Sequence, residues 1–304
     1  TGMTPADFVD YVQRIAQSVG FPMERVILGG DHLGPLTWTS LPEHEAMEHA
    51  RVLVAAYAGA GFTKIHIDTS MKVASDDPDT RLSDAVIARR GAALCAASEA
   101  AYAVYQKTHP QAQKPVYVIG SEVPIPGGTQ EQETMQITSP ADCESTIKTF
   151  FSAFEAAELT DVWQRVVGVV VQPGVEYGSH DVVQYDRELA KPLHTVLERH
   201  PQLCFEAHST DYQTREHLHQ LVEDGLLISR RRWRRFWRST LSTRSSTQML
   251  PVVIGRHWRR RWSKNPTSGK NITTALRLSS ASTASTACPT GSGIIPPSRP
   301  CMMR

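Results

Sequence analysis

The chain has 304 residues, of which 40% are hydrophobic, and its 32 Lys and Arg against 31 Asp and Glu give a net charge of +1. This length is enough for one large domain or two smaller ones. The sequence contains no apolar run long enough to cross a membrane, and its first residues lack the basic and apolar segments of a secretory leader, so we expect a soluble, cytoplasmic protein.

Helix-forming segments and short apolar segments alternate along the first part of the chain. Helices are expected at residues 4–19, 43–58, 83–105, 140–157 and 187–200. Strands are expected at residues 25–30, 63–68, 115–120, 165–172 and 202–207. This alternation predicts an α/β protein with a parallel sheet, and its uniform repetition favours a (β/α)8 TIM barrel over an open sheet. Only five strands are visible, whereas a closed barrel needs about eight, so we expect an incomplete barrel.

The first of these strands ends in a glycine pair. Val26 to Leu28 form an apolar run of the kind found in a buried parallel sheet. Gly29 and Gly30 are then predicted to turn the backbone, which would present Asp31 and His32 at the carboxyl end of the strand. In α/β folds that end of the sheet is where functional sites are built.

Polar residues follow the other strands in the same way. His32, Glu122 and His208 each come at the end of a separate strand and could converge on one divalent cation, since imidazole and carboxylate are its usual ligands. Asp31 would then be a candidate for proton transfer. The alternative is that these residues only solvate the mouth and cap loops. The other residues expected at the mouth are His66, Asp68, Gln172, Glu176, Ser209 and Asp211.

Five loop motifs carry a family resemblance. GGDHLGP, KIHIDTSM, GSEVPIPGG, VVQPGVEYG and FEAHSTDYQT, in this order, closely resemble the GatZ/KbaZ family, the second subunit of the class II D-tagatose-1,6-bisphosphate aldolase of galactitol and N-acetylgalactosamine breakdown. The resemblance covers residues 1–225. It implies a relative of the zinc-dependent class II aldolases, which are (β/α)8 barrels.

The resemblance also implies roles for single residues. Asp31 and His32 match the acid/base and a metal ligand of the catalytic aldolases, and His208 with Ser209 stands where those enzymes have a further metal histidine. Gln172 occurs where they have another. An amide oxygen is a weaker zinc ligand than imidazole, so a full catalytic zinc site is not expected. The family is accordingly regarded as non-catalytic, and the expected partner is the catalytic aldolase subunit, whose activity and stability this subunit supports.

Several alternatives stay open at this point. Zinc and a sugar phosphate are candidate ligands, and the chain could be a metal-dependent aldolase in its own right or a tagatose-6-phosphate kinase, a label that has attached to this family. The kinase alternative is weakened because no GxGxxG or GxxxxGK[ST] loop follows any predicted strand.

Residues 226–304 form a different kind of sequence. Residues 229–304 hold half of the 32 basic residues and no acidic residue, with Trp set among Arg. Family members are expected to have two further strands before the first residue of this chain and another after residue 225. A nucleic-acid-binding tail is one interpretation. The other is a reading-frame shift, because a one-base slip with suitably chosen codons turns residues 268–274 and 290–295 into family-like sequence. We expect an out-of-frame tail.

Overall fold

The computed structural model describes residues 2–120, 136–177, 181–210 and 212–226. Its helices are α1 Pro5–Ser18, α2 Glu43–Gly59, α3 Asp84–Thr108, α4 Pro140–Ala156, α5 Thr160–Trp163, α6 Arg187–Arg199 and α7 Arg215–Glu223, with 3-10 turns at Met23–Arg25 and Pro35–Trp38. Its strands are β1 Gly29–Leu33, β2 Lys64–Ile67, β3 Val116–Ile119, β4 Val166–Val170, β5 Glu176–Tyr177, β6 Val182–Val183 and β7 Cys204–Glu206. No helix among these residues is both long and apolar enough to span a bilayer.

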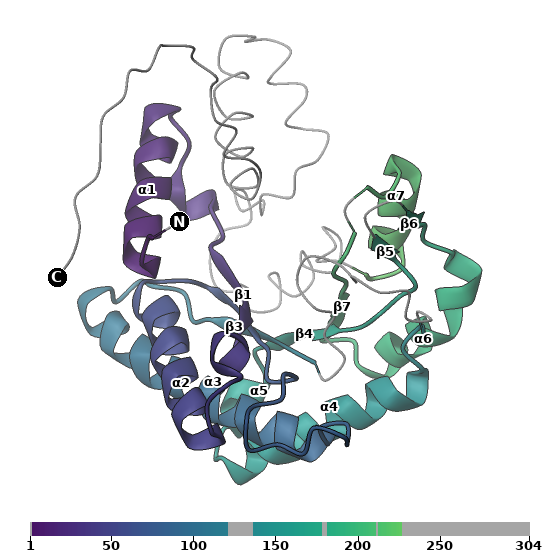
Figure 1. Cartoon of the computed structure of the whole chain (residues 1–304). Helices are drawn as coiled ribbons and strands as arrows, with labels where there is room; N and C mark the ends of the chain where they lie inside the picture. Colours follow the sequence, from purple (N-terminus) through teal and green to yellow (C-terminus); the bar gives the residue numbers. More distant parts are fainter. Residues whose placement is uncertain (1, 121–135, 178–180, 211, 227–304) are drawn as a thin grey trace, which may run out of the picture. The chain divides into compact units, whose positions relative to one another are not determined.

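The main sheet has five parallel strands in the order β1-β2-β3-β4-β7, which is also their order along the chain. Figure 1 shows α2, α3 and α4 along one face of this sheet. The predicted α/β alternation and parallel sheet are therefore confirmed. In the described part of the chain the five strands do not close into a barrel.

Four of the five predicted helices have a side-chain cap at their first turn, and α2, which follows Pro42, has none. Thr4 and Asp7 make a reciprocal capping box before α1. The side chains of Ser83, Ser139 and Asp186 accept backbone N–H groups at the starts of α3, α4 and α6. Helix α7 and the short hairpin formed by β5 and β6 were not among the predicted elements.

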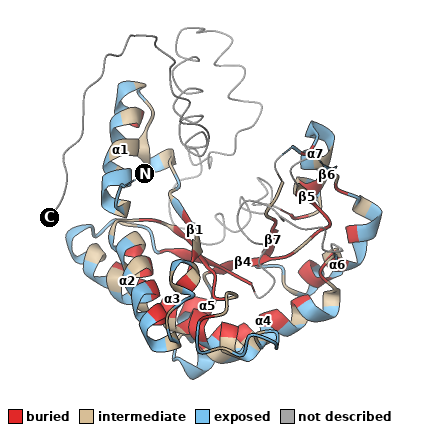
Figure 2. Cartoon of the chain, viewed as in Figure 1, coloured by how far each residue is buried: buried red, intermediate tan, exposed pale blue. Residues whose placement is uncertain are grey.

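The core lies between the sheet and its helices (Figure 2). Ile65 and Ile67 of β2 are completely buried and belong to the same cluster as Phe150 and Phe154 of α4. Because side chains alternate along a strand, Lys64 and His66 must point to the opposite face from Ile65 and Ile67. The sheet thus has one apolar face and one face that carries polar groups.

The predicted position of the first strand is wrong. β1 begins at Gly29 rather than at Arg25, and Ile27, expected inside the sheet, is 46% exposed. The glycine pair lies in the strand instead of turning away from it. A Cβ at Gly30 would lie 2.7 Å from side-chain atoms of Leu33 and Tyr57, so close packing, not a turn, requires this glycine.

Two site residues and the tail cannot be compared with the structure. Glu122, Asp211 and residues 227–304 lie outside the described residues. The expected basic tail and its out-of-frame origin therefore stay predictions.

Candidate functional site

The polar face of the sheet gathers ionisable groups from β1, β2 and β7 and from the residues that follow β2 and β7. Lys64, His66 and Asp68 follow one another at every second position and so share one face. His32 comes from β1, and His208 follows β7. β1 and β7 are the two outermost strands of the sheet, and in a flat sheet they would lie about 19 Å apart. The contact between His32 and His208 therefore requires the sheet to curl, which brings the ends of its outer strands together.

Three imidazoles converge there. The ring centroids of His32 and His208 are 4.6 Å apart, those of His32 and His66 are 5.1 Å apart, and those of His66 and His208 are 5.2 Å apart. One ring nitrogen of each lies within 4.8 Å of the others. His32 and His208 were expected to share a cation, whereas His66 was expected at the mouth but not as a ligand.

Asp68 orients the first of these rings. Its Oδ2 atom lies 2.9 Å from Nδ1 of His32, and its Oδ1 atom accepts hydrogen bonds from the backbone and hydroxyl groups of Ser70. Burial works against the charged carboxylate, but the hydrogen bonds from His32 and Ser70 outweigh it and lower the pKa of Asp68. Because the carboxylate accepts a hydrogen bond from Nδ1–H, Nε2 of His32 keeps a free lone pair, as in many metal-binding histidines.

The other two imidazoles are held neutral, His66 fully buried and His208 half-buried. Burial, followed by the charge of Lys64, holds the pKa of His66 well below its usual value. Burial, followed by the proximity of His32, lowers the pKa of His208 to about 4. The Nε2 atoms of both rings are buried without a hydrogen-bond partner. Unpartnered buried nitrogens of this kind are costly unless a ligand satisfies them.

This donor set fits one divalent metal ion of the zinc class. The weakest member is His66, because its Nδ1 accepts the backbone N–H of His32 at 3.3 Å, which puts the ring proton on Nε2. Ligation through Nε2 would give up that hydrogen bond, at a cost of about 1 kcal/mol. His32 and His208 have no such conflict.

A lysine and two carboxylates adjoin the imidazoles. The ammonium of Lys64 donates to Oδ1 of Asp31 and, at 2.7 Å, to Oε1 of Glu206. Burial opposes the charge of Lys64, but the attraction of Glu206 and Asp31 outweighs it and raises the lysine's pKa. Burial also raises the pKa of Glu206, against the opposing charge of Lys64. Neither Lys64 nor Glu206 was predicted as a site residue.

The backbone around the site is specialised. His32 has φ +52° and Ser209 has φ +54°, both in the left-handed region that non-glycine residues rarely adopt. At His32 this coincides with an irregularity in the pairing of β1 with β2. A Cβ at Gly34 would lie 1.6 Å from the carbonyl oxygen of Asp68, so only glycine lets these two loops meet. Such strain is concentrated at functional sites.

Two other predicted mouth residues have local partners. The amide oxygen of Gln172 accepts the backbone N–H groups of Gly174 and Val175. Glu176 is buried and accepts the N–H of Tyr177. In the described structure both side chains therefore make hydrogen bonds within their own loop.

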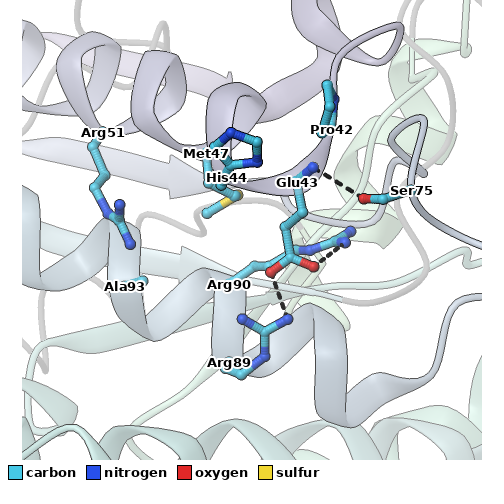
Figure 3. Close-up of a pocket in the computed structure, with 9 residues that line it drawn as sticks. All are labelled: Pro42, Glu43, His44, Met47, Arg51, Ser75, Arg89, Arg90 and Ala93. Atoms are coloured by element: carbon cyan, nitrogen blue, oxygen red, sulfur yellow. Dashed lines mark hydrogen bonds and ion pairs between the residues drawn. The ribbon is translucent and has the colours of Figure 1, made fainter.

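A hollow of about 450 Å³, lined by several charged side chains, lies beside α2 and α3 (Figure 3). Arg90, whose side chain is fully buried, donates to Glu43 and Asp76. Arg89 pairs with the other oxygen of Glu43. These charges pair with one another, although Nε of Arg90 is buried without a hydrogen-bond partner. We therefore interpret these residues as a structural connection between the two helices and the loop that carries Ser75, whose hydroxyl accepts the N–H of Glu43.

Comparison with known proteins gives consistent results. The family model described as "D-tagatose-1,6-bisphosphate aldolase subunit GatZ/KbaZ-like" matches residues 1–230. The GatZ subunits of D-tagatose-1,6-bisphosphate aldolase from Salmonella dublin and from Salmonella typhimurium LT2 are each 47% identical over 229 residues, which cover 75% of this chain and 52% of the relative. This chain thus spans about half the length of these curated relatives.

A solved structure is also similar. The crystal structure of a probable tagatose 6 phosphate kinase from Sinorhizobium meliloti 1021 superimposes with a TM-score of 0.64 at 44% identity, covering 74% of this chain and 53% of that one.

Proposed function

Because the chain belongs to the GatZ/KbaZ-like family of D-tagatose-1,6-bisphosphate aldolase subunits, we propose that it acts as a subunit of this aldolase in tagatose phosphate breakdown. The family match over residues 1–230 is the observation that carries this proposal. The proposed partner is the catalytic class II subunit, whose activity and stability this chain would raise. A role in sugar-phosphate metabolism agrees with the cytoplasmic location expected from the sequence.

We also infer that the five-stranded sheet is part of a (β/α)8 barrel. Its strands are parallel and follow chain order, as in a barrel. After α7 the chain returns to the sheet beyond β7, where the N–H of Phe205 donates to the carbonyl of Gly225 at 2.9 Å and Leu226 pairs with Phe205 in a parallel bridge. This contact has the position expected of a next barrel strand.

The pairing of Asp31 with Lys64 supports a non-catalytic role for this chain on its own. Asp31 matches the acid/base residue of the catalytic aldolases, but its carboxylate here holds an ammonium group. A carboxylate in an ion pair is a weaker proton acceptor than a free one. The charge of Lys64 also opposes a second cation beside His66, so we expect weak metal binding.

A metal-dependent aldolase is the second candidate, and the three imidazoles favour it. A zinc ion held by His32, His66 and His208 would supply Lewis-acid polarisation of a substrate carbonyl. The chain's own contribution would be to orient His32 through Asp68 and to keep the other rings neutral. A bound sugar phosphate is compatible with either candidate.

Cleavage assays with D-tagatose 1,6-bisphosphate separate the candidates. The chain alone is expected to show no turnover, and a catalytic class II subunit is expected to turn over faster when the chain is added. If the turnover of the catalytic subunit does not change at a saturating concentration of this chain, the subunit proposal is refuted. Turnover by the chain alone that is abolished by His32→Ala and by a chelator would instead establish the second candidate.

A further inference from the structure

A second potential ligand group lies beside the imidazoles. Asp31, His66 and Glu206 each place one ligand atom within 4.8 Å of the others, and this group shares His66 with the cluster of three histidines. Nδ1 of His66 lies 3.9 Å from both the Asp31 and the Glu206 carboxylates. Two carboxylates and an imidazole are a common ligand set for divalent metals such as Zn²⁺ and Mn²⁺.

This position already contains a cation, the ammonium of Lys64. It bonds to one oxygen of each carboxylate, and the Lys64 side chain is only 9% exposed. The remaining oxygen of Glu206, Oε2, is buried without a hydrogen-bond partner. The group therefore still offers one unsatisfied ligand atom that the ammonium does not reach.

The neighbouring strand makes room for this lysine. Gly29 of β1 is the register partner of Lys64 in β2, and a Cβ at Gly29 would lie 3.1 Å from Cδ of Lys64. The lysine stem thus passes over a position without a side chain. Because Gly29 has no side chain, the aliphatic part of Lys64 can lie against the neighbouring strand and place its ammonium deep in the site.

We propose that the Lys64 ammonium is the resident cation of the Asp31–His66–Glu206 group, so that this edge of the sheet can take one divalent ion, at the imidazoles, and not two. Lys64 is then a positioning residue that fixes both carboxylates. Removing its charge converts the group into a second metal site. This role of Lys64 does not depend on the assignment as an aldolase subunit.

Metal stoichiometry tests the proposal. The full chain and its Lys64→Met and Lys64→Ser variants are dialysed against Co²⁺ or Mn²⁺, and bound metal per chain is measured by mass spectrometry, with the Co²⁺ absorption spectrum as a second readout. The unchanged chain is expected to bind no more than one ion, and each variant is expected to gain one. Lys72→Met is the matched control, because Lys72 donates to the exposed carbonyl of Pro78 and no gain is expected.

Two further variants locate the gained ion. Glu206→Gln in the Lys64→Met background should remove the gained ion. Asp31→Asn in the otherwise unchanged chain should lose no ion, because the bound ion is expected at the imidazoles and not at the carboxylates. Folded Lys64 variants that gain no metal, or an unchanged chain that loses an ion on Asp31→Asn, would overturn the proposal.

Discussion

Replacing Asp68 by Asn is expected to weaken divalent-metal binding by about 10- to 100-fold. Oδ1 of Asp68 accepts two hydrogen bonds from Ser70, so an Asn at this position would keep its oxygen there and turn its NH₂ group toward His32. Nδ1 of His32 would then become an acceptor. The ring proton would move to Nε2. Nε2 is the atom that binds the metal when Asp68 holds the proton on Nδ1, so the variant would oppose metal binding at this ring.

The magnitude follows from the charged hydrogen bond that the metal-bound state of the Asn variant cannot make, because Nδ1–H would then face an NH₂ group. The bond between His32 and the Asp68 carboxylate is 2.9 Å long, and a bond to a charged group contributes about 1.5–3 kcal/mol. Because about 1.4 kcal/mol corresponds to a tenfold change in affinity, the loss is about one to two orders of magnitude.

Competition between the chain and a chromophoric chelator for Zn²⁺ measures this effect. Ser70→Ala is the matched control, since it removes a hydrogen bond to the same carboxylate without changing the group that faces His32. It should cost much less affinity. Equal affinity of Asp68→Asn and the unchanged chain would refute the orienting role of Asp68, and no zinc binding by the unchanged chain would refute the imidazole site itself.

Further predictions concern stability, activity and the tail. Arg90→Met should lower the free energy of unfolding by about 3 kcal/mol, because it leaves the Glu43 and Asp76 carboxylates without their buried partner. Arg89→Met, at an exposed position, should lower it by only about 0.5 kcal/mol. Equal midpoints of urea unfolding for the two variants would contradict this. Hydrogen bonds from Arg90 lower the pKa values of both carboxylates, so their stabilisation is full above their usual pKa values of 4.5 and 3.8 and disappears as the pH falls through the lowered values. Arg90→Met should flatten this acid-dependent loss in urea unfolding curves. No ATP-dependent phosphorylation of tagatose 6-phosphate is expected, and turnover free of contaminating kinase would reverse that view. Sequencing the gene should reveal a family-like continuation in another frame beginning at residues 223–232; a frame closed by stop codons would favour a genuine basic tail.

Helix positions could be predicted because their determinants are local. Thr4, Ser83 and Ser139 each begin a helix through a bond to a backbone group a few residues away. The first strand could not be placed correctly, because the apolar run before Gly29 resembles a buried strand. Its true position depends on packing against Tyr57, which is distant in sequence.

The site was predicted only in part. His208 follows a recognisable strand and His32 follows a recognisable glycine pair, whereas the role of Lys64 depends on Glu206, which is 142 residues away. One signal was present in the sequence. Lys64, His66 and Asp68 alternate with Ile65 and Ile67, which predicts a polar face on an otherwise buried strand. The sequence could not say which groups that face would meet.

The most direct test of the account is the thermal inactivation of a catalytic class II D-tagatose-1,6-bisphosphate aldolase subunit in the presence of increasing amounts of this chain. If the chain is a supporting subunit, the half-life of the aldolase activity should lengthen and reach a plateau at a fixed molar ratio, while an equal mass of an unrelated protein has no effect. A half-life that does not change at any ratio would contradict the proposed function.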